Sequence, residues 1–387
     1  MLILRNADVF TPAPAGRADI LVAGGQIARI EPAIRIGDPY ADVIDATGLA
    51  AVPGFIDGHV HITGGGGEGG YATRTPELVL SDAVRGGITT VVGCLGTDGV
   101  TRSLPGLLAK ARGLDDEGIS SFIYTGYYAV PVRTLTGSIE RDLLLIDKVI
   151  GVGEIALSDH RSTQPTFDEM ARIAAEARRG GILSGKAGVV NAHMGDGRRG
   201  LSLLRRIVDE TEIPVAQLLP THVNRNPVLF AEAVAYAKAG GLVDLTTSGI
   251  PAFFEEGEVK CSKGLRTMLE SGVDATHVTF TSDGQGSVPV FDAQGRLQRL
   301  GVGRVTSLFA EVRDAVLEEH VPLGIALRTI TANPAEILKL HRKGHLAAGA
   351  DADIVLLEPA TLDIRGVIAR GRWMMKDGDV LVRGTFE

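Results

Sequence analysis

The sequence predicts an α/β protein, a (β/α)8 TIM-like barrel that carries a small β-sandwich domain built from both termini. Two observations support this fold. Apolar runs alternate with helical patterns through the middle of the 387-residue chain, and short β-branched runs separated by Pro and Gly clusters occupy both ends. We expect residues 1–50 plus 346–387 to form the small β domain and residues 51–345 to form the barrel.

The apolar runs of the middle region are eight in number, as a closed barrel requires. Fully apolar strands between helices are typical of a parallel sheet covered on both faces. The expected strands are Ala51–His61, Ile88–Leu95, Ser121–Tyr128, Val149–Leu157, Ile182–His193, Val215–His222, Leu242–Thr247 and His277–Ser282. An open, doubly wound sheet is the alternative, but no G-x-G-x-x-G motif opens a helix after the first strand.

Helical patterns separate these strands and also follow the last one. The expected helices are Pro76–Arg85, Leu104–Asp115, Thr166–Arg179, Leu201–Glu212, Val228–Ala239, Arg304–Glu319 and Leu323–Leu340. At the two ends the expected strands are Leu2–Leu4, Asp19–Val22, Gln26–Ile30, Ala352–Leu357, Asp363–Ala369, Arg372–Lys376 and Val380–Val382. Because each end alone is too short to build a core, we expect the two ends to pair.

Composition and charge exclude several classes of partner. The net charge is −8, and Lys and Arg form no long run, which argues against binding to nucleic acid or to an anionic membrane. Two cysteines are too few for a disulfide framework. No apolar stretch approaches the length of a membrane span, and the N-terminus does not resemble a signal peptide. We therefore expect a cytoplasmic protein.

Histidines and carboxylates follow the ends of the expected strands, where the catalytic groups of a barrel lie. His59 and His61 are separated by one residue, so on a strand both imidazoles point to the same face. Imidazole and carboxylate are the usual ligands of Zn²⁺ and similar divalent ions. The candidate metal ligands at these ends are His59, His61, Glu154, His193, His222 and Asp283.

The stretch from Pro53 to His61, Pro-Gly-Phe-Ile-Asp-Gly-His-Val-His, resembles the signature of the amidohydrolase superfamily. Further segments resemble the β-aspartyl (isoaspartyl) dipeptidases of that superfamily: Gly64–Gly70, Gly96–Asp98, Tyr127–Tyr128, Ser158–Arg161, His193–Asp196, Thr221–Arg225 and Ser282–Ser287. The resemblance implies a metallo-dipeptidase that cleaves the β-aspartyl peptide bond of a small dipeptide with a metal-activated hydroxide. It also implies two Zn²⁺ ions per chain, held by the six ligands above, and a homo-oligomer, an octamer.

Glu154 is the point at which this sequence departs from the family. The family pattern places a lysine there, which carries CO₂ as a carbamate and bridges the two metal ions. Glu154 supplies its own carboxylate on a shorter side chain. We expect it to bridge the ions, because an unpaired carboxylate inside a barrel is costly. The alternatives are that Glu154 is hydrogen-bonded beside a single ion, or that Lys186 provides the carbamate instead.

The remaining candidate residues concern catalysis and the substrate. Asp283 is expected to accept the proton of the attacking water and to pass it to the leaving amine, and the Tyr128 hydroxyl to donate to the oxyanion. Arg161 and Arg225 suit the carboxylates of an anionic substrate. The resemblance assigns substrate contacts to Glu68, Thr97, Tyr128, Arg161, Arg225 and Ser287.

The same residues are compatible with two other functional hypotheses. A cyclic-amide hydrolase or an N-acyl-amino-acid deacylase would use the same scaffold, but cyclic amides lack the free ammonium group that Glu68 suits. A non-catalytic binding protein that has lost its metals is the third hypothesis. Asp57 is expected to be a turn residue or a partner of the ligands rather than a ligand itself, and Cys94 a small core residue.

Overall fold

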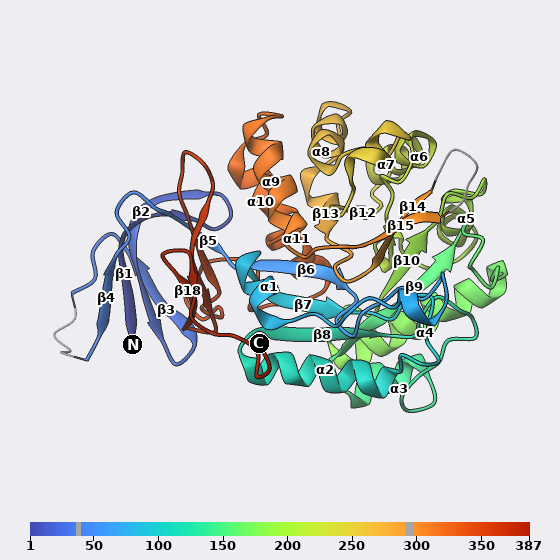
Figure 1. Ribbon diagram of the computed structural model, residues 1–387, viewed down its shortest axis with the longest axis horizontal. Coiled ribbons are helices and arrows are strands. Elements are labelled where there is room, and N and C mark those ends of the chain that lie inside the picture. The colour runs from blue at the N-terminus through green and yellow to red at the C-terminus, as the bar shows by residue number, and fades with distance from the viewer. Residues whose placement is uncertain (36–39, 292–296) are drawn as a thin grey trace.

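The computed structural model describes residues 1–35, 40–291 and 297–387, and it places a β-rich region beside a helix-covered parallel sheet (Figure 1). Strands from both ends of the chain join in one nine-stranded sheet, in the order β19-β18-β17-β16-β5-β1-β2-β3 with β4 beside β1. Its strands are β1 (Leu2–Phe10), β2 (Pro14–Ala23), β3 (Gln26–Glu31), β4 (Asp42–Asp45), β5 (Ala50–Pro53), β16 (Ile354–Leu357), β17 (Ile364–Ala369), β18 (Arg372–Lys376) and β19 (Asp379–Val380).

Strand β5 connects the two ends of the chain. It pairs in parallel with β1 and antiparallel with β16, so the N-terminal and C-terminal strands become one hydrogen-bonded sheet. Ile20, Ile27, Ile354 and Ile368 share an apolar core on this sheet. The two ends therefore bury together the apolar surface that neither could cover alone.

The middle of the chain forms a curved parallel sheet. Six strands pair in the order β11-β10-β9-β8-β7-β6, and two more pair as β12-β13. They are β6 (Phe55–Val60), β7 (Ile88–Gly93), β8 (Ser120–Thr125), β9 (Val149–Leu157), β10 (Val189–Met194), β11 (Leu218–Thr221), β12 (Val243–Thr246) and β13 (Val278–Thr281). Backbone hydrogen bonds also place β12 beside β11 and the end of β13 beside β6: Val223 N donates to Asp244 O over 3.3 Å, and His61 N to Gly284 O over 2.9 Å.

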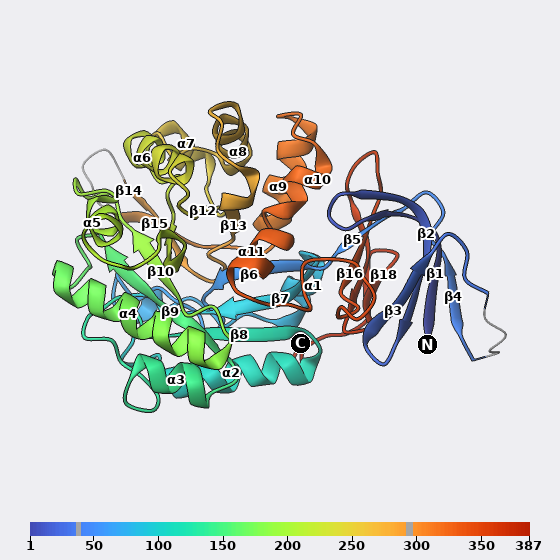
Figure 2. The same cartoon turned by 180° about the vertical axis from the view of Figure 1, so that it is seen from behind.

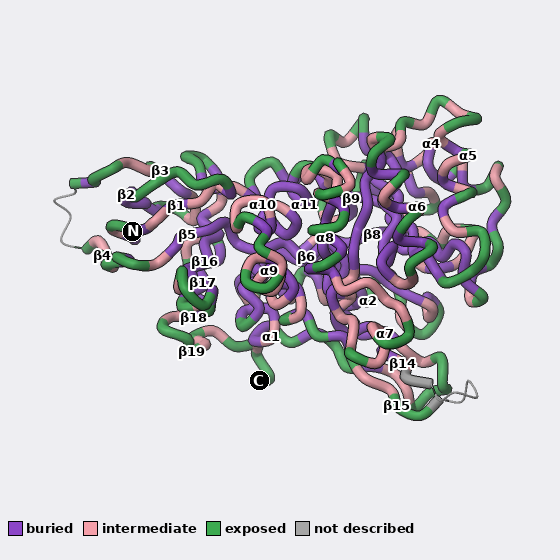
Figure 3. Tube along the Cα trace, turned by 90° about the horizontal axis from the view of Figure 1, so that it is seen from above, coloured by how far each residue is buried: buried purple, intermediate pink, exposed green. Residues whose placement is uncertain are grey.

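Helices cover the outer face of these strands, which lie buried inside (Figures 2 and 3). The helices are α1 (Leu80–Arg85), α2 (Leu104–Glu117), α3 (Ile139–Leu145), α4 (Phe167–Ser184), α5 (Ser202–Glu210), α6 (Pro227–Lys238), α7 (Pro251–Glu255), α8 (Cys261–Glu270), α9 (Ser307–Leu317), α10 (Leu323–Arg328) and α11 (Ala332–Ile337). Helix α4 is an example in which the residues that start and end the helix can be identified. Thr166 and Glu169 form a capping box at its start, and Gly185 ends it with a left-handed φ of 72°.

Several sequence-based boundaries differ from the structure. The expected strand from Ile182 begins only at Val189, because Ile182–Ser184 complete helix α4. The expected helix Leu323–Leu340 is divided into α10 and α11. Pro334 lies in the first turn of α11, where the missing backbone N–H is tolerated. Its ring would clash with the carbonyl of Ile330 in a continuous helix, so α10 cannot run on into α11 without a break. Helices α3, α7 and α8 and the hairpin of β14 (Ser287–Phe291) and β15 (Leu297–Val302) were not predicted.

Over the described ranges, no helix combines the length and the apolar character that crossing a bilayer requires.

Candidate metal centre

The six predicted metal ligands gather at the carboxyl ends of the parallel strands. His59 lies in β6 and His61 directly after it, Glu154 in β9 and His193 in β10, and His222 and Asp283 follow β11 and β13. The strand register explains the gathering. His193 pairs with Thr221, so that His222 comes next to it on the neighbouring strand.

Glu154 lies at the middle of this group and has no solvent exposure. One carboxylate oxygen, Oε2, lies 2.9 Å from Nδ1 of His193, 3.4 Å from Nε2 of His59 and 3.5 Å from Nε2 of His222. The other oxygen, Oε1, lies 3.4 Å from Nε2 of His61. Asp283 closes the group, with Oδ1 3.0 Å from Nε2 of His61 and 3.8 Å from Nε2 of His59.

Two overlapping sets of ligand atoms in the described part of the chain are close enough to hold a metal ion. One set comprises His59, His61, Cys94 and Glu154, and the other comprises Glu154, His193 and His222. Glu154 belongs to both. A carboxylate shared by two imidazole sets has the arrangement expected of a bridging ligand.

The donor atoms fit a divalent cation. Both ring nitrogens of His59, Nε2 of His222 and Oε1 of Glu154 are buried and have no hydrogen-bond partner. Each unsatisfied buried polar group costs about 1–3 kcal/mol, so a cluster of them is stable only if something else satisfies it. Imidazole nitrogens and carboxylate oxygens in this proportion suit Zn²⁺ and similar divalent ions.

Electrostatics keep the carboxylates of the cluster ionised. Burial alone would raise the pKa of Glu154, but the neighbouring His59 and His193 outweigh it and hold that pKa well below its usual range. The pKa of Asp283 is also lowered, since the hydrogen bond and charge of His61 outweigh its burial. Burial and the nearby His193 lower the pKa of His222 to about 3, so this imidazole is neutral and available as a ligand.

Neighbouring residues hold the ligands in place. Thr246 Oγ1 lies 2.5 Å from Nδ1 of His222, which leaves Nε2 facing the cluster. Asp57 accepts hydrogen bonds from the backbone N–H and the hydroxyl of Ser282, and thereby fixes the residue before Asp283. His222 and Asp283 both have left-handed backbones, with φ of 62° and 50°. Such strain in non-glycine residues is concentrated at functional sites.

A cavity of about 420 Å³ opens beside the cluster, and the predicted substrate residues Glu68, Thr97, Tyr128, Arg161, Arg225 and Ser287 all line it. Glu68 lies at their centre. The hydroxyls of Thr97 and Ser287 donate to its two oxygens over 3.0 and 3.2 Å, and Arg161 lies 3.3 Å away. The hydroxyl of Tyr128 lies 2.9 Å from Nδ1 of His193.

Asp159 is a site residue that the sequence analysis missed. Its Oδ2 lies 3.1 Å from Nε2 of His193 and accepts a hydrogen bond from Arg161 over 2.7 Å. Burial would raise the pKa of Asp159, but these partners lower it, so the carboxylate is charged. It joins a candidate metal ligand to a candidate substrate residue. Its place in the quoted Ser158–Arg161 segment, two residues before Arg161, was the available signal.

Cys94 was expected to be a small core residue. It does pack in an apolar cluster with Val92 and Tyr124, but its Sγ also lies 3.8 Å from Nδ1 of His61. The register of β6 and β7, in which Val60 pairs with Gly93, brings these two residues together. Cys94 is thus a packing residue and also a member of one candidate ligand set.

Lys186 lies away from the cluster, so it offers no alternative to Glu154. Its ammonium group donates to the carbonyl oxygens of Leu143 and Ile146 over 2.8 and 2.5 Å. Those carbonyls belong to the end of α3 and the loop before β9, on the side opposite the carboxyl ends of the strands.

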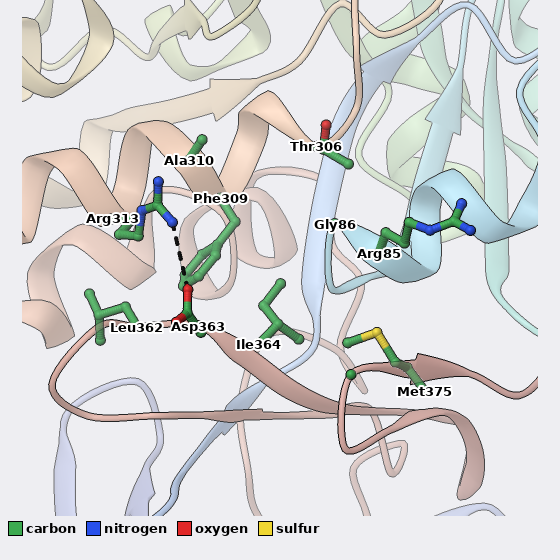
Figure 4. A pocket seen from close by; sticks show the side chains of 11 residues that line it. Arg85, Gly86, Thr306, Phe309, Ala310, Arg313, Leu362, Asp363, Ile364 and Met375 are labelled. Atoms are coloured by element: carbon green, nitrogen blue, oxygen red, sulfur yellow. Dashed lines mark ion pairs between the residues drawn. The ribbon is translucent and has the colours of Figure 1, made fainter.

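Another cavity, of about 340 Å³, lies where α9 meets β17 and β18 (Figure 4). Phe309, Ile364 and Met375 line it, and Arg313 and Asp363 pair across 3.8 Å at one side. Neither candidate ligand set of the described residues lies in it. We therefore place the candidate active site at the carboxyl ends of the parallel strands.

The chain is similar to several known proteins. The model of the Amidohydrolase family matches residues 50–374. A crystal structure of the β-aspartyl dipeptidase from Fervidobacterium islandicum, in complex with the β-Asp-Leu dipeptide, is 47% identical, covers 98% of both chains and superposes with a TM-score of 0.91. Among curated proteins, the allantoinase of Deinococcus radiodurans is 26% identical and aligns with 94% of this chain and 88% of its own length. The dihydroorotase of Elusimicrobium minutum is also 26% identical, with coverage of 92% and 88%.

The family match spans most of the chain and contains every member of the histidine and carboxylate cluster. The chain belongs to the amidohydrolase family and is a metal-dependent hydrolase.

Proposed function

We propose that this enzyme is a dipeptidase that hydrolyses the β-aspartyl (isoaspartyl) peptide bond of dipeptides. The observation that carries the proposal is the set of charges around the cavity beside the metal centre. Glu68 and Arg161 face each other across 3.3 Å, and Arg225 lines the same cavity. A β-aspartyl dipeptide carries one free ammonium group and two free carboxylates, which match one glutamate and two arginines.

The Fervidobacterium relative supports the same substrate, because its structure contains β-Asp-Leu. The curated relatives are hydrolases of cyclic amides by name, at much lower identity. A cyclic amide has no ammonium group for Glu68. The charge pattern therefore favours the dipeptide over a cyclic amide.

For the metal we propose two Zn²⁺ ions, one held mainly by His59 and His61, the other by His193 and His222, with Glu154 shared between them. Asp283 would complete the first set. When bound, such ions lower the pKa of water and polarise a carbonyl group.

The chain's own residues would carry out the remaining steps. Asp283 is ionised and faces the cavity, so it can accept the proton of the attacking water and deliver it to the leaving amine. The Tyr128 hydroxyl, which lines the same cavity, would donate to the oxyanion of the tetrahedral intermediate. Burial raises the pKa of Tyr128, and so the phenol keeps its proton for this role. Glu68 and Arg161 would release each other to hold the substrate ammonium and carboxylate.

We also propose that the eight parallel strands act as one complete (β/α)8 barrel, with residues 51–345 as the catalytic domain. Residues 1–50 and 346–387 would form the small β domain. The backbone hydrogen bonds that place β12 beside β11 and β13 beside β6 support this framework.

The test is a panel of substrates assayed with metal content measured on the same samples. We expect β-Asp-Leu to be hydrolysed at least about a hundredfold faster than α-Asp-Leu, allantoin or dihydroorotate, because one displaced charge pair costs about 2–4 kcal/mol of transition-state binding. Arg225→Ala should lose roughly thirty- to a thousandfold in kcat/KM. Arg112→Ala, which changes an exposed arginine, is the matched control.

Equal turnover of α-Asp-Leu would refute the substrate assignment. Preferential turnover of a cyclic amide would instead favour the function of the curated relatives.

A further inference from the structure

We propose that a second cavity beside the metal centre receives the leaving residue of the dipeptide and prefers a cationic side chain there, such as lysine or arginine. This rests on the proposed dipeptidase function and extends it to the residue on the far side of the scissile bond.

The position of the cavity supports this assignment. It has a volume of about 380 Å³, and its lining residues come in part from α7, from the loop that leads into α6 and from the start of β14. Figure 1 shows where these elements lie. Asp196, Arg225, Asp283, Ser287 and Pro289 line both this cavity and the one that contains Glu68. The two cavities therefore meet at Asp283, beside the reacting bond.

The metal centre faces this second cavity as well. His222 lines it and is only 3% exposed, and its Nε2 is buried without a hydrogen-bond partner. Asp283, whose Oδ1 lies 3.0 Å from Nε2 of His61, lines the same cavity. When Glu68 and Arg161 hold the aspartyl group of the substrate in the first cavity, the leaving residue of the substrate has to extend past Asp283. The second cavity is the space that it enters.

Arg225 is positioned to hold the backbone carboxylate of the leaving residue. It lies at the junction of the two cavities, and its Nε is buried without a hydrogen-bond partner. No ion pair within the described ranges uses its guanidinium group. Its guanidinium group is therefore available to bind a substrate carboxylate.

The far wall of the cavity carries the opposite charge. Glu256 and Glu258 line it, and neither carboxylate has an ion pair or hydrogen bond among the residues that the structure describes. Glu258 is half-buried, and burial raises its pKa to about 7 even though Arg225 opposes the shift. A half-buried carboxylate without a partner is stabilised by a cation that enters the cavity.

Phe253 completes the wall. A lysine or arginine side chain has an apolar stem that can pack on such a ring and a charged end that can reach the glutamates. An acidic leaving residue would meet like charge at the same place.

The test compares β-Asp-Lys with β-Asp-norleucine, which has a stem of similar length and no charge, and with β-Asp-Glu. For the zinc-loaded wild type we expect kcat/KM to be roughly tenfold higher for β-Asp-Lys than for β-Asp-norleucine, and lower again for β-Asp-Glu. The lysine preference should weaken as ionic strength rises. Calorimetric titration with free L-lysine and free L-norleucine, the two products, should show the same order of affinity.

Glu258→Gln should bring the lysine-to-norleucine ratio toward one, and Glu256→Gln should reduce it by less. Glu255→Gln is the matched control, because Glu255 is the last residue of α7, is exposed and does not line the cavity. Thermal unfolding of each variant shows whether it is folded.

Equal kcat/KM for the lysine and norleucine peptides, or a ratio that Glu258→Gln leaves unchanged, would overturn the subsite while the dipeptidase function stands. Failure of the metal-loaded enzyme to cleave any of the three β-aspartyl peptides would overturn both.

Discussion

Oε2 of Glu154 lies 2.9 Å from Nδ1 of His193. The other oxygen of the same carboxylate lies 3.4 Å from Nε2 of His61, on a different strand. The Glu154 carboxylate thus contacts a histidine of each candidate ligand set, His61 in one and His193 in the other. A lysine carbamate would reach this position from a longer stem, whereas Glu154 reaches it directly from β9. This relationship gives two separate predictions.

The first prediction concerns metal content. Glu154→Ala should lower bound metal from about two ions per chain toward one and reduce turnover sharply, because the shared carboxylate holds both ions. Glu154→Gln should show the same loss of metal and turnover, because the glutamine side chain has a similar volume but lacks the negative charge that offsets two cations. Metal analysis of the dialysed proteins measures the first effect, and hydrolysis of β-Asp-Leu measures the second. A Glu154→Ala enzyme with full metal content would mean that another group bridges.

The second prediction concerns carbon dioxide. A carboxylate that belongs to the side chain cannot be lost, so activation of the metal-free protein by zinc should be independent of added bicarbonate. The measurement is the rate of reactivation in degassed buffer with and without bicarbonate. Activation that depends on bicarbonate would indicate a lysine carbamate. Lys186, whose ammonium group is bound to carbonyls of Leu143 and Ile146, is not positioned to supply it.

The third prediction concerns Asp159, which contacts both His193 and Arg161. Asp159→Asn removes the charge that orients both groups, so we expect zinc affinity and kcat/KM for β-Asp-Leu each to fall by about 10–100-fold. Competition with a zinc chelator measures the affinity. Asp168→Asn, an exposed change at the start of α4, is the control. A variant that loses kcat/KM but binds zinc as tightly as wild type would limit Asp159 to positioning Arg161.

The fourth prediction concerns the pH dependence of stability. Asp244 is fully buried between β11, β12 and β13, and burial raises its pKa to about 6 despite hydrogen bonds from Thr221, Thr279 and Thr281. In the unfolded chain an aspartate titrates near pH 4, so between about pH 4 and 6 the folded protein binds more protons. The contribution of Asp244 to stability is therefore present at pH 4 and lost as the pH rises through 6.

Asp244→Asn removes this titration. Relative to wild type, the variant should gain up to about 3 kcal/mol in unfolding free energy between pH 4 and pH 7. Denaturation curves of both proteins across this range provide the measurement, with the exposed Asp147→Asn as control. Parallel pH profiles for wild type and Asp244→Asn would show that burial does not shift this carboxyl.

The sequence by itself determined where the candidate ligands lie along the chain. Apolar runs mark buried strands because burial of consecutive residues leaves a local pattern. The polar residue after each run must then lie at the carboxyl end of a strand. On this basis His59, His193 and Asp283 could be assigned to one edge of the parallel strands before any distance was known. The same pattern failed at Ile182–Ser184, because a short apolar run reads the same in a helix and in a strand.

Only the tertiary structure decided which of these side chains meet. The distance between residues of different strands depends on the register in which the strands pair, and the sequence of one segment does not specify that register. It places Asp159 against His193, Cys94 beside His61 and Glu154 between two sets of imidazoles. The tertiary structure also forms the second cavity from the loop before α6, from α7 and from the loop after β13, which lie apart in the sequence. The physical reason is that ion pairs and cavities are properties of packed surfaces, whereas periodicity is a property of one segment.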